Sequence, residues 1–128
     1  RAGGIVQRAQ HARLLAQAME ALTSTAMRFL QWSAGGKLEL VPLAANRYLE
    51  MMSETAIGWL LLDAAVIAIA AGEKLPADHP DRAFYDGKRY AAQFYAQNVV
   101  ATVPMKAQQI GKEDRLPLQI SDAAFATL

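Results

Sequence analysis

Few residues in this chain have the types and spacing that catalysis or metal binding needs. His11 and His79 fall on a predicted helix and in a predicted loop, and neither has a carboxylate or cysteine partner at ligand spacing. Gly87 and Lys88 are superficially similar to a phosphate loop, but the glycine-rich run and the Ser or Thr after the lysine are missing. We therefore predict no catalytic residue, no metal site and no cofactor-binding residue in this chain.

Asp63 is the one carboxylate in an unusual setting, because it stands inside the apolar run 56–71, AIGWLLLDAAVIAIAA. If its side chain is buried, it must be paired or protonated, since an isolated ion in an apolar interior is heavily penalised. One interpretation is a general base or a proton-bearing acid. The other is structural: a partner for an arginine or a tyrosine hydroxyl, or an edge position near solvent. A lone carboxylate without convergent polar groups favours the structural interpretation, so we predict Asp63 as a buried polar residue of unknown role.

The charges are unevenly distributed along the chain. Residues 1–37 carry a net charge of +4 and the remainder carries −3. One interpretation is a basic helix that lies against an acidic neighbour or faces water, and the other is a docking face for another domain or an anionic ligand such as a nucleotide phosphate. On the second interpretation we name Arg8, Arg13 and Trp32 as tentative interdomain contacts, with core packing as the alternative for Trp32.

Size and composition favour a single α-helical domain over residues 1–128. The chain has 128 residues, 53% of them hydrophobic, a net charge of +1 and no cysteine. The charge gives no signature of nucleic-acid binding, and the absence of cysteine excludes disulfides and fits a reducing compartment, so we expect a cytoplasmic location. Because the sequence does not begin with methionine, we expect a fragment of a larger polypeptide.

Two long helices are predicted in the first part of the chain. The first covers 5–33 and ends at Gly35 and Gly36, which favour the left-handed conformation of a helix C-terminus. Its predicted apolar seam repeats every three to four residues: Ala12, Leu15, Met19, Leu22, Ala26 and Phe29. The second helix covers 43–71, begins after Pro42 and is predicted to be engulfed by its neighbours along 56–71, because that run is apolar on every side. The run is shorter than the roughly 20 residues of a membrane span and carries a charge at its midpoint, so we predict no span.

A third helix is predicted from Asp81, with a kink at Pro104 and a continuation to Ile110, because proline clashes with the carbonyl four residues earlier. A loop with Leu116 and Leu118 packed inward should follow, and then a short helix that starts at Ser121 and is anchored by Phe125. The predicted fold class is all-α: an antiparallel bundle of three long helices, the third kinked, plus a short C-terminal helix.

Two blocks of sequence, in order on two predicted helices, suggest a family. The first block lies within 45–65 and contains Tyr48-Leu49 and Gly58-Trp59-Leu60-Leu61. The second contains Phe84-Tyr85, Lys88, Ala92, Phe94-Tyr95 and Val99 through Pro104. With the long first helix, these blocks resemble the small helical domain at the C-terminus of certain acyl-CoA dehydrogenases, called acetyl-CoA dehydrogenase C-terminal-like.

The resemblance implies a parent enzyme of fatty acid metabolism that contains FAD and desaturates acyl-CoA thioesters between Cα and Cβ. In that family a glutamate removes the α-proton, hydride passes to the flavin, and electrons leave to an electron-transfer flavoprotein. The resemblance places this machinery in other domains, so neither Glu50 nor Glu54 is assigned the catalytic role. The domain itself is expected to pack against the remaining domains of the parent dehydrogenase or its dimer mate, and it could border the CoA entrance.

Three hypotheses from different classes follow. The leading one is a non-catalytic C-terminal helical domain of an acyl-CoA dehydrogenase-like oxidoreductase. The alternative is a stand-alone helical-bundle module for protein interaction, with the basic first helix as its contact face. A remote third is an enzyme centred on Asp63. The full open reading frame separates the first two, because only the first expects a dehydrogenase body upstream.

Overall fold

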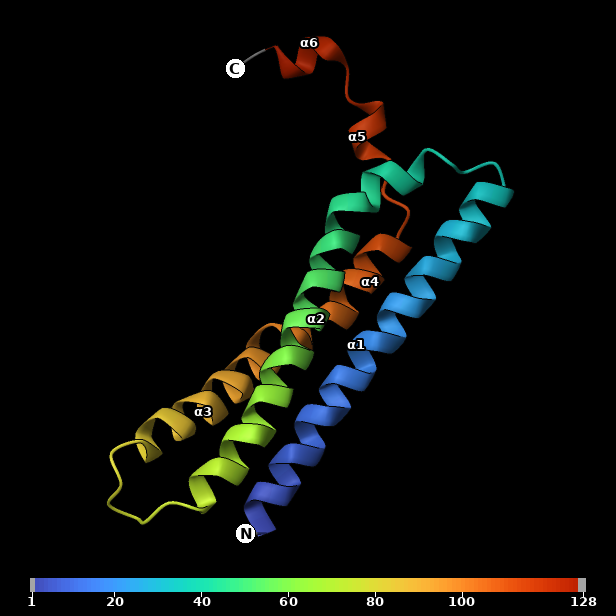
Figure 1. Cartoon of the computed structure of the whole chain (residues 1–128). Coiled ribbons are helices and arrows are strands. Elements are labelled where there is room, and N and C mark those ends of the chain that lie inside the picture. Colours follow the sequence, from blue (N-terminus) through green and yellow to red (C-terminus); the bar gives the residue numbers. More distant parts are fainter. Residues whose placement is uncertain (1, 127–128) are drawn as a thin grey trace.

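The computed structural model describes residues 2–126, apart from the side chains of Ala2, Ile5 and Val6. It is all-α in this part of the chain, as predicted, with long helices that pack against one another (Figure 1). Helices α1 (Ala2–Ala34) and α2 (Leu40–Glu73) run antiparallel, and α3 (Arg82–Asn98), η1 (Val100–Thr102) and α4 (Val103–Gly111) together form the kinked third helix. The three-helix architecture is therefore confirmed.

Helix α1 buries a different seam from the one that periodicity predicted. Its buried positions are separated by three, four or seven residues and so share one face, but most of them carry small or polar side chains: His11, Ala18, Ala21, Thr25 and Trp32. The predicted seam residues Ala12 and Met19 are exposed, so that part of the prediction is wrong. Small side chains let helices approach closely, and the larger apolar residues of α1 then lie at the flanks of the contact, half-buried.

Helix α2 begins at Leu40, three residues before the predicted start, with Pro42 in its first turn. Proline is tolerated there because the N–H groups of the first turn have no partner within the helix. At Gly58 the helix meets η1 so closely that an added Cβ would lie 2.4 Å from Cγ2 of Val100. Glycine is needed at this position because no side chain fits between the two elements.

The kink in the third helix is confirmed, and the structure places its break before the proline. Helix α3 ends at Asn98, one turn of 3-10 helix follows, and α4 then carries Pro104 in its first turn. Because a proline ring collides with the carbonyl four residues earlier, which here belongs to Val100, the regular helix is interrupted at residues 99–102. The break turns Val100 and Val103 into the core, where they are 1% and 0% exposed.

The C-terminal segment does not pack as predicted. Residues Leu116–Gln119 form the short helix α5, and Leu116 and Leu118 are 67% and 51% exposed, not packed inward. Helix α6 (Asp122–Phe125) starts as predicted, with Oγ of Ser121 accepting a hydrogen bond from the backbone N–H of Ala124 at 3.3 Å. Phe125 anchors nothing within the described chain, since it is 60% exposed. Both helices lead away from the bundle (Figure 1).

The core lies where α1, the first half of α2 and the kinked segment meet. Helix α4 packs against both α1 and α2, while α3 packs mainly along the second half of α2 (Figure 1). The buried apolar cluster consists of Ala18, Ala21, Trp32, Leu40, Ala44, Met51, Val100, Val103 and Ile110. The second half of α2 therefore has neighbours on one side only, and the prediction that the run 56–71 is engulfed by this chain's own helices is wrong.

Candidate functional site

The uncovered side of α2 carries large apolar side chains. Within the run 56–71, the residues turned toward the bundle are small, namely Gly58, Ala65 and Ala68. Leu61, Leu62 and Ile69 are half-buried, whereas four other large residues of the run face outward: Trp59, Leu60, Val66 and Ile67 are 58%, 56%, 50% and 64% exposed. A soluble helix normally turns its large apolar residues toward its own core, so this arrangement indicates a surface that another body covers.

We call this surface the α2 stripe. Its members recur every three to four residues, with two adjacent pairs at 59–60 and 66–67, and all are exposed: Leu49, Met52, Ala56, Trp59, Leu60, Asp63, Val66, Ile67 and Ala70. Residues at this spacing share one face of an α-helix. At about 1.5 Å per residue the stripe is on the order of 30 Å long, and contiguous apolar surface of this kind marks interaction sites on soluble proteins.

Asp63 lies near the middle of the α2 stripe. It is exposed, so the prediction of a buried carboxylate is wrong for this chain by itself, and the edge position near solvent is the interpretation that holds. Its four neighbours on the helix surface, three and four residues away on each side, are Trp59, Leu60, Val66 and Ile67. Within residues 2–126 the carboxylate has no hydrogen-bond or ion-pair partner.

By length and composition alone, α2 is also able to cross a membrane. A window of 18 residues within Leu40–Glu73 has a mean hydropathy of 1.9, and 17% of that window is buried. The prediction against a span considered only the run 56–71, whereas the helix is more than twice as long. One helix of this kind is weak evidence for a span, because the core helix of a soluble protein passes the same test.

The tentative interdomain contacts separate into two groups. Arg8 and Arg13 are exposed and form no ion pair with the rest of the described chain, so both remain available to a partner. Trp32 is 4% exposed and packs on Phe29 with ring centroids 5.6 Å apart. It therefore offers almost no surface to another domain, and the core-packing alternative is the correct one.

Trp32 is held by a cluster that the sequence did not indicate. Its indole N–H donates to Oε1 of Glu113 at 2.8 Å, and Lys37 Nζ donates to Oε2 of the same carboxylate at 2.9 Å. The hydrogen bonds from Lys37 and Trp32 lower the pKa of Glu113. Because Glu113 follows α4 and Lys37 precedes α2, the cluster joins both to the end of α1, and no local spacing could have predicted it.

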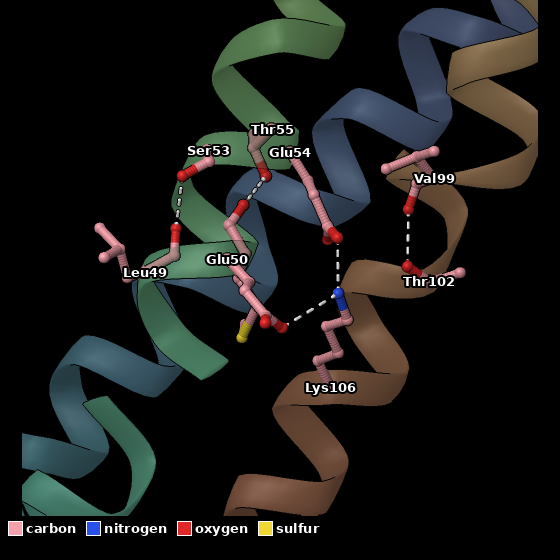
Figure 2. A network of polar contacts seen from close by, with 9 residues as sticks. Leu49, Glu50, Ser53, Glu54, Thr55, Val99, Thr102 and Lys106 are labelled. Atoms are coloured by element: carbon pink, nitrogen blue, oxygen red, sulfur yellow. Dashed lines mark hydrogen bonds and ion pairs between the residues drawn. The ribbon is translucent and has the colours of Figure 1, made fainter. Parts of the chain in front are cut away.

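A second polar cluster joins α2 to α4 on the side of α2 opposite the stripe (Figure 2). Nζ of Lys106 donates to Oε1 of Glu54 at 2.6 Å and lies 3.6 Å from Oε2 of Glu50. The hydrogen bond to Glu54 raises the pKa of Lys106, and burial, with the charge of Glu54, raises the pKa of Tyr95. The other oxygen of Glu54, Oε2, is buried without a partner in the described chain.

We call the cluster of Glu50, Glu54 and Lys106 the Lys106 clamp. The only sequence signal for it was the spacing of the two glutamates, which stand one helical turn apart. This spacing does not predict Lys106 as the partner, because the kink before Pro104 determines where Lys106 lies relative to the two glutamates. Lys106 and the two glutamates fix α4 on α2, and Glu50 and Glu54 also line a hollow of about 400 Å³ together with Asn46, Leu49 and Ser53.

A cleft of about 520 Å³ lies between the start of α1, the second half of α2 and α3. Arg8, Arg89 and Glu73 supply its charges, and an apolar wall comes from α2. His11 lines it from a position 3% exposed, and burial lowers the pKa of the imidazole. Gln97 Nε2, which only donates, lies 3.3 Å from His11 Nε2, so the contact requires a neutral ring.

Catalytic or metal-binding constellations are not found in the described residues. No three His, Asp or Glu side chains between 2 and 126 gather to hold a metal ion. His79 lies in the loop before α3, where its Nδ1 accepts from the backbone N–H of Asp81 at 3.2 Å, far along the chain from His11. What the molecule offers instead is a contact surface on α2.

Most of this chain is similar in sequence to parts of known proteins. The model of a family described as acetyl-CoA dehydrogenase C-terminal like matches residues 3–121. A butyryl-CoA dehydrogenase from Syntrophomonas wolfei is 36% identical over 96 residues, which is 73% of this chain and 15% of that relative. A broad-specificity linear acyl-CoA dehydrogenase, FadE5, from Mycobacterium tuberculosis is 33% identical over 85 residues, which is 66% of this chain and 14% of that relative. The chain thus spans no more than 15% of the length of either relative.

Proposed function

Because the chain belongs to the acetyl-CoA dehydrogenase C-terminal-like family, we propose that it is the C-terminal helical domain of an acyl-CoA dehydrogenase and packs on the rest of that enzyme. The α2 stripe carries this proposal. The second half of α2 buries Gly58, Ala65 and Ala68 and exposes several of its large apolar residues, which leaves a surface for a second protein body to cover. In the relatives, at least 85% of the length lies outside the matched region and is able to supply that body.

The parent enzyme is proposed to be an FAD oxidoreductase that desaturates acyl-CoA thioesters. Bound flavin would accept the hydride in that reaction. The cleft beside Arg8 and Arg89 does not fit the flavin, because no Phe, Tyr or Trp among its described lining residues could stack on an isoalloxazine, and the carboxylate of Glu73 shares the space that a pyrophosphate needs. We therefore assign the domain a supporting role, with FAD and the catalytic glutamate in other domains.

The domain is proposed to meet either the body of its own polypeptide or that of a dimer mate, and the whole enzyme is proposed to act in fatty acid metabolism. The cytoplasmic location stays a prediction from the cysteine-free sequence.

Expression of residues 1–128 alone tests the supporting role. We expect a helical protein without flavin absorbance and without thioester desaturation, which binds a dye for apolar surfaces through the uncovered stripe. Replacing Leu60 and Ile67 by glutamine should reduce dye binding without loss of helicity, because both side chains are more than half exposed. Stoichiometric FAD or turnover by the isolated chain would overturn the assignment.

A further inference from the structure

The charges of α2 suggest what the partner of the stripe must carry. From Tyr48 to Glu73 the helix has four acidic residues and no basic one. Lys106 pairs with Glu50 and Glu54 on the side facing α4. Asp63 has no such partner within residues 2–126, and its nearest surface neighbours on the helix are all apolar.

Covering the stripe removes Asp63 from water. A carboxylate enclosed by Trp59, Leu60, Val66 and Ile67 loses its hydration, and it is stabilised only by an opposite charge or by taking up a proton. The chain itself supplies neither an arginine nor a lysine to this side of α2 between residues 48 and 73. If Asp63 stays charged when the stripe is covered, the compensating cation has to come from the body that covers it.

A second copy of this chain does not meet that requirement. In a symmetric dimer built on the full stripe, the two-fold axis passes near its middle, and Asp63 lies within about 5 Å of that point along the helix. The two Asp63 side chains would then lie on opposite sides of the axis, about 10 Å apart along the helices, and each would face the region of Ala56 in the other stripe, which has no basic residue to pair with it.

A lipid bilayer also fails to supply a cation that could pair with Asp63. Asp63 would stand near the centre of the apolar surface, where an acidic side chain is costly in hydrocarbon. Arg47 and Lys74 flank this segment, but they stand 16 and 11 residues from Asp63, so neither could pair with its carboxylate within a bilayer.

We propose that an arginine or lysine of the dehydrogenase body forms an ion pair with Asp63 inside the interface that covers the α2 stripe. This inference rests on the proposed function. The apolar residues of the stripe supply the buried area, while the single ion pair fixes the register, because sliding by one helical turn would leave both charges unpaired and desolvated.

The test uses the full-length holoenzyme with Ala70→Cys, which introduces a thiol at an exposed stripe position in a chain region without cysteine. The rate of alkylation of this thiol, read by mass spectrometry, reports how often the stripe is uncovered. We expect slow alkylation in the holoenzyme and fast alkylation in the isolated chain. Adding Asp63→Asn or Asp63→Leu should speed alkylation in the holoenzyme about tenfold or more, because one partner of a buried ion pair is left alone.

Glu20→Leu is the matched control, since Glu20 is an exposed acid on α1 without an ion pair in the described chain, and it should leave the rate unchanged. If Asp63→Leu slows alkylation or leaves it unchanged while the stripe stays protected, the ion pair is wrong and the packing proposal survives. Equal rates in the holoenzyme and the isolated chain would remove the packing proposal and the ion pair together. Protection that appears only with lipid vesicles would assign the stripe to a membrane and overturn the inference.

Discussion

Gly58 sets the distance between α2 and the kinked segment. A Cβ at this position would lie 2.4 Å from Val100, whose side chain is 1% exposed and has no room to move. Gly58→Ala should therefore destabilise the domain by about 1–3 kcal/mol through overpacking, even though alanine is the better helix former. Chemical denaturation of the isolated domain measures the change.

Gly87→Ala is the matched control, because nothing lies within 4 Å of its added Cβ on the open side of α3. It should stabilise the domain by about 0.5–1 kcal/mol, the ordinary gain in helix propensity. Equal effects of the two substitutions would mean that α2 and η1 do not approach as closely as the structure shows.

Lys106 bridges the largely buried Glu54 and the exposed Glu50, whose side chains keep 20% and 63% of their surface, and removing this lysine should destabilise the domain. Lys106→Met leaves Glu54 desolvated without a cation. We expect a loss of about 1–3 kcal/mol of unfolding free energy. This is less than for a fully buried ion pair, because the side chains of Lys106 and Glu54 each keep 20% of their surface exposed. Lys112→Met, at the end of the same helix and without an ion pair in the described chain, should change the unfolding free energy by less than about 0.5 kcal/mol.

The pH dependence of the same variant has a defined sign. Because the pKa of Lys106 is raised above its ordinary value of 10.5, its contribution is complete below that pH in the folded protein and disappears as the pH rises through the raised pKa. The stability difference between the native protein and Lys106→Met should therefore shrink above about pH 10.5 and stay constant from pH 7 to 9. A difference that already changed between pH 7 and 9 would contradict the assignment.

At the scale of the helices, sequence patterns predicted which elements exist but not how each one is turned. Proline chemistry indicated the kink in the third helix, and glycine indicated the end of α1. The seam of α1 was misplaced because periodicity weights large apolar residues, whereas close packing buries small ones such as Ala18 and Ala21. The clamp of Lys106 with Glu54 could not be predicted, since it depends on the position of the kink.

The α2 stripe shows a different limit of sequence reasoning. A helix that is apolar on every side has no periodicity to indicate which side its own chain covers. The sequence therefore suggested a rod surrounded on all sides, and Asp63 was placed in the interior with it. Only the packing of α3 against Gly58, Ala65 and Ala68 reveals that the opposite side is open.

Helices α5 and α6 should contribute little to the stability of the bundle. None of their described residues is buried, and both lead away from the other helices. A chain that ends at Arg115 keeps the hydrogen bond from Arg115 to Glu39 and should lose less than about 1 kcal/mol of unfolding free energy. A cooperative loss of helicity in α1–α4 after this truncation, seen by circular dichroism, would show that the segment docks on the bundle after all.

At the scale of the whole molecule, we propose that this domain forms one half of an interface. Its own core lies toward α1 and α4, and the second half of α2 is covered on one side only. Under the proposed function, the bundle folds around its own core and a partner removes its largest apolar surface from water. Its contribution to the enzyme would then be structural, because it would hold or shape the body on which it packs.

Hydroxyl-radical modification, read residue by residue by mass spectrometry, tests this claim most directly. Trp59 and Leu60 on the stripe are compared between the full-length dehydrogenase and the isolated chain, and Trp32, buried inside the bundle, serves as the reference that is slow in both. We predict that in the full-length enzyme Trp59 and Leu60 slow to a rate near that of Trp32, while in the isolated chain they react fast. Fast modification of Trp59 and Leu60 in both proteins, with Trp32 slow in both, would contradict the account.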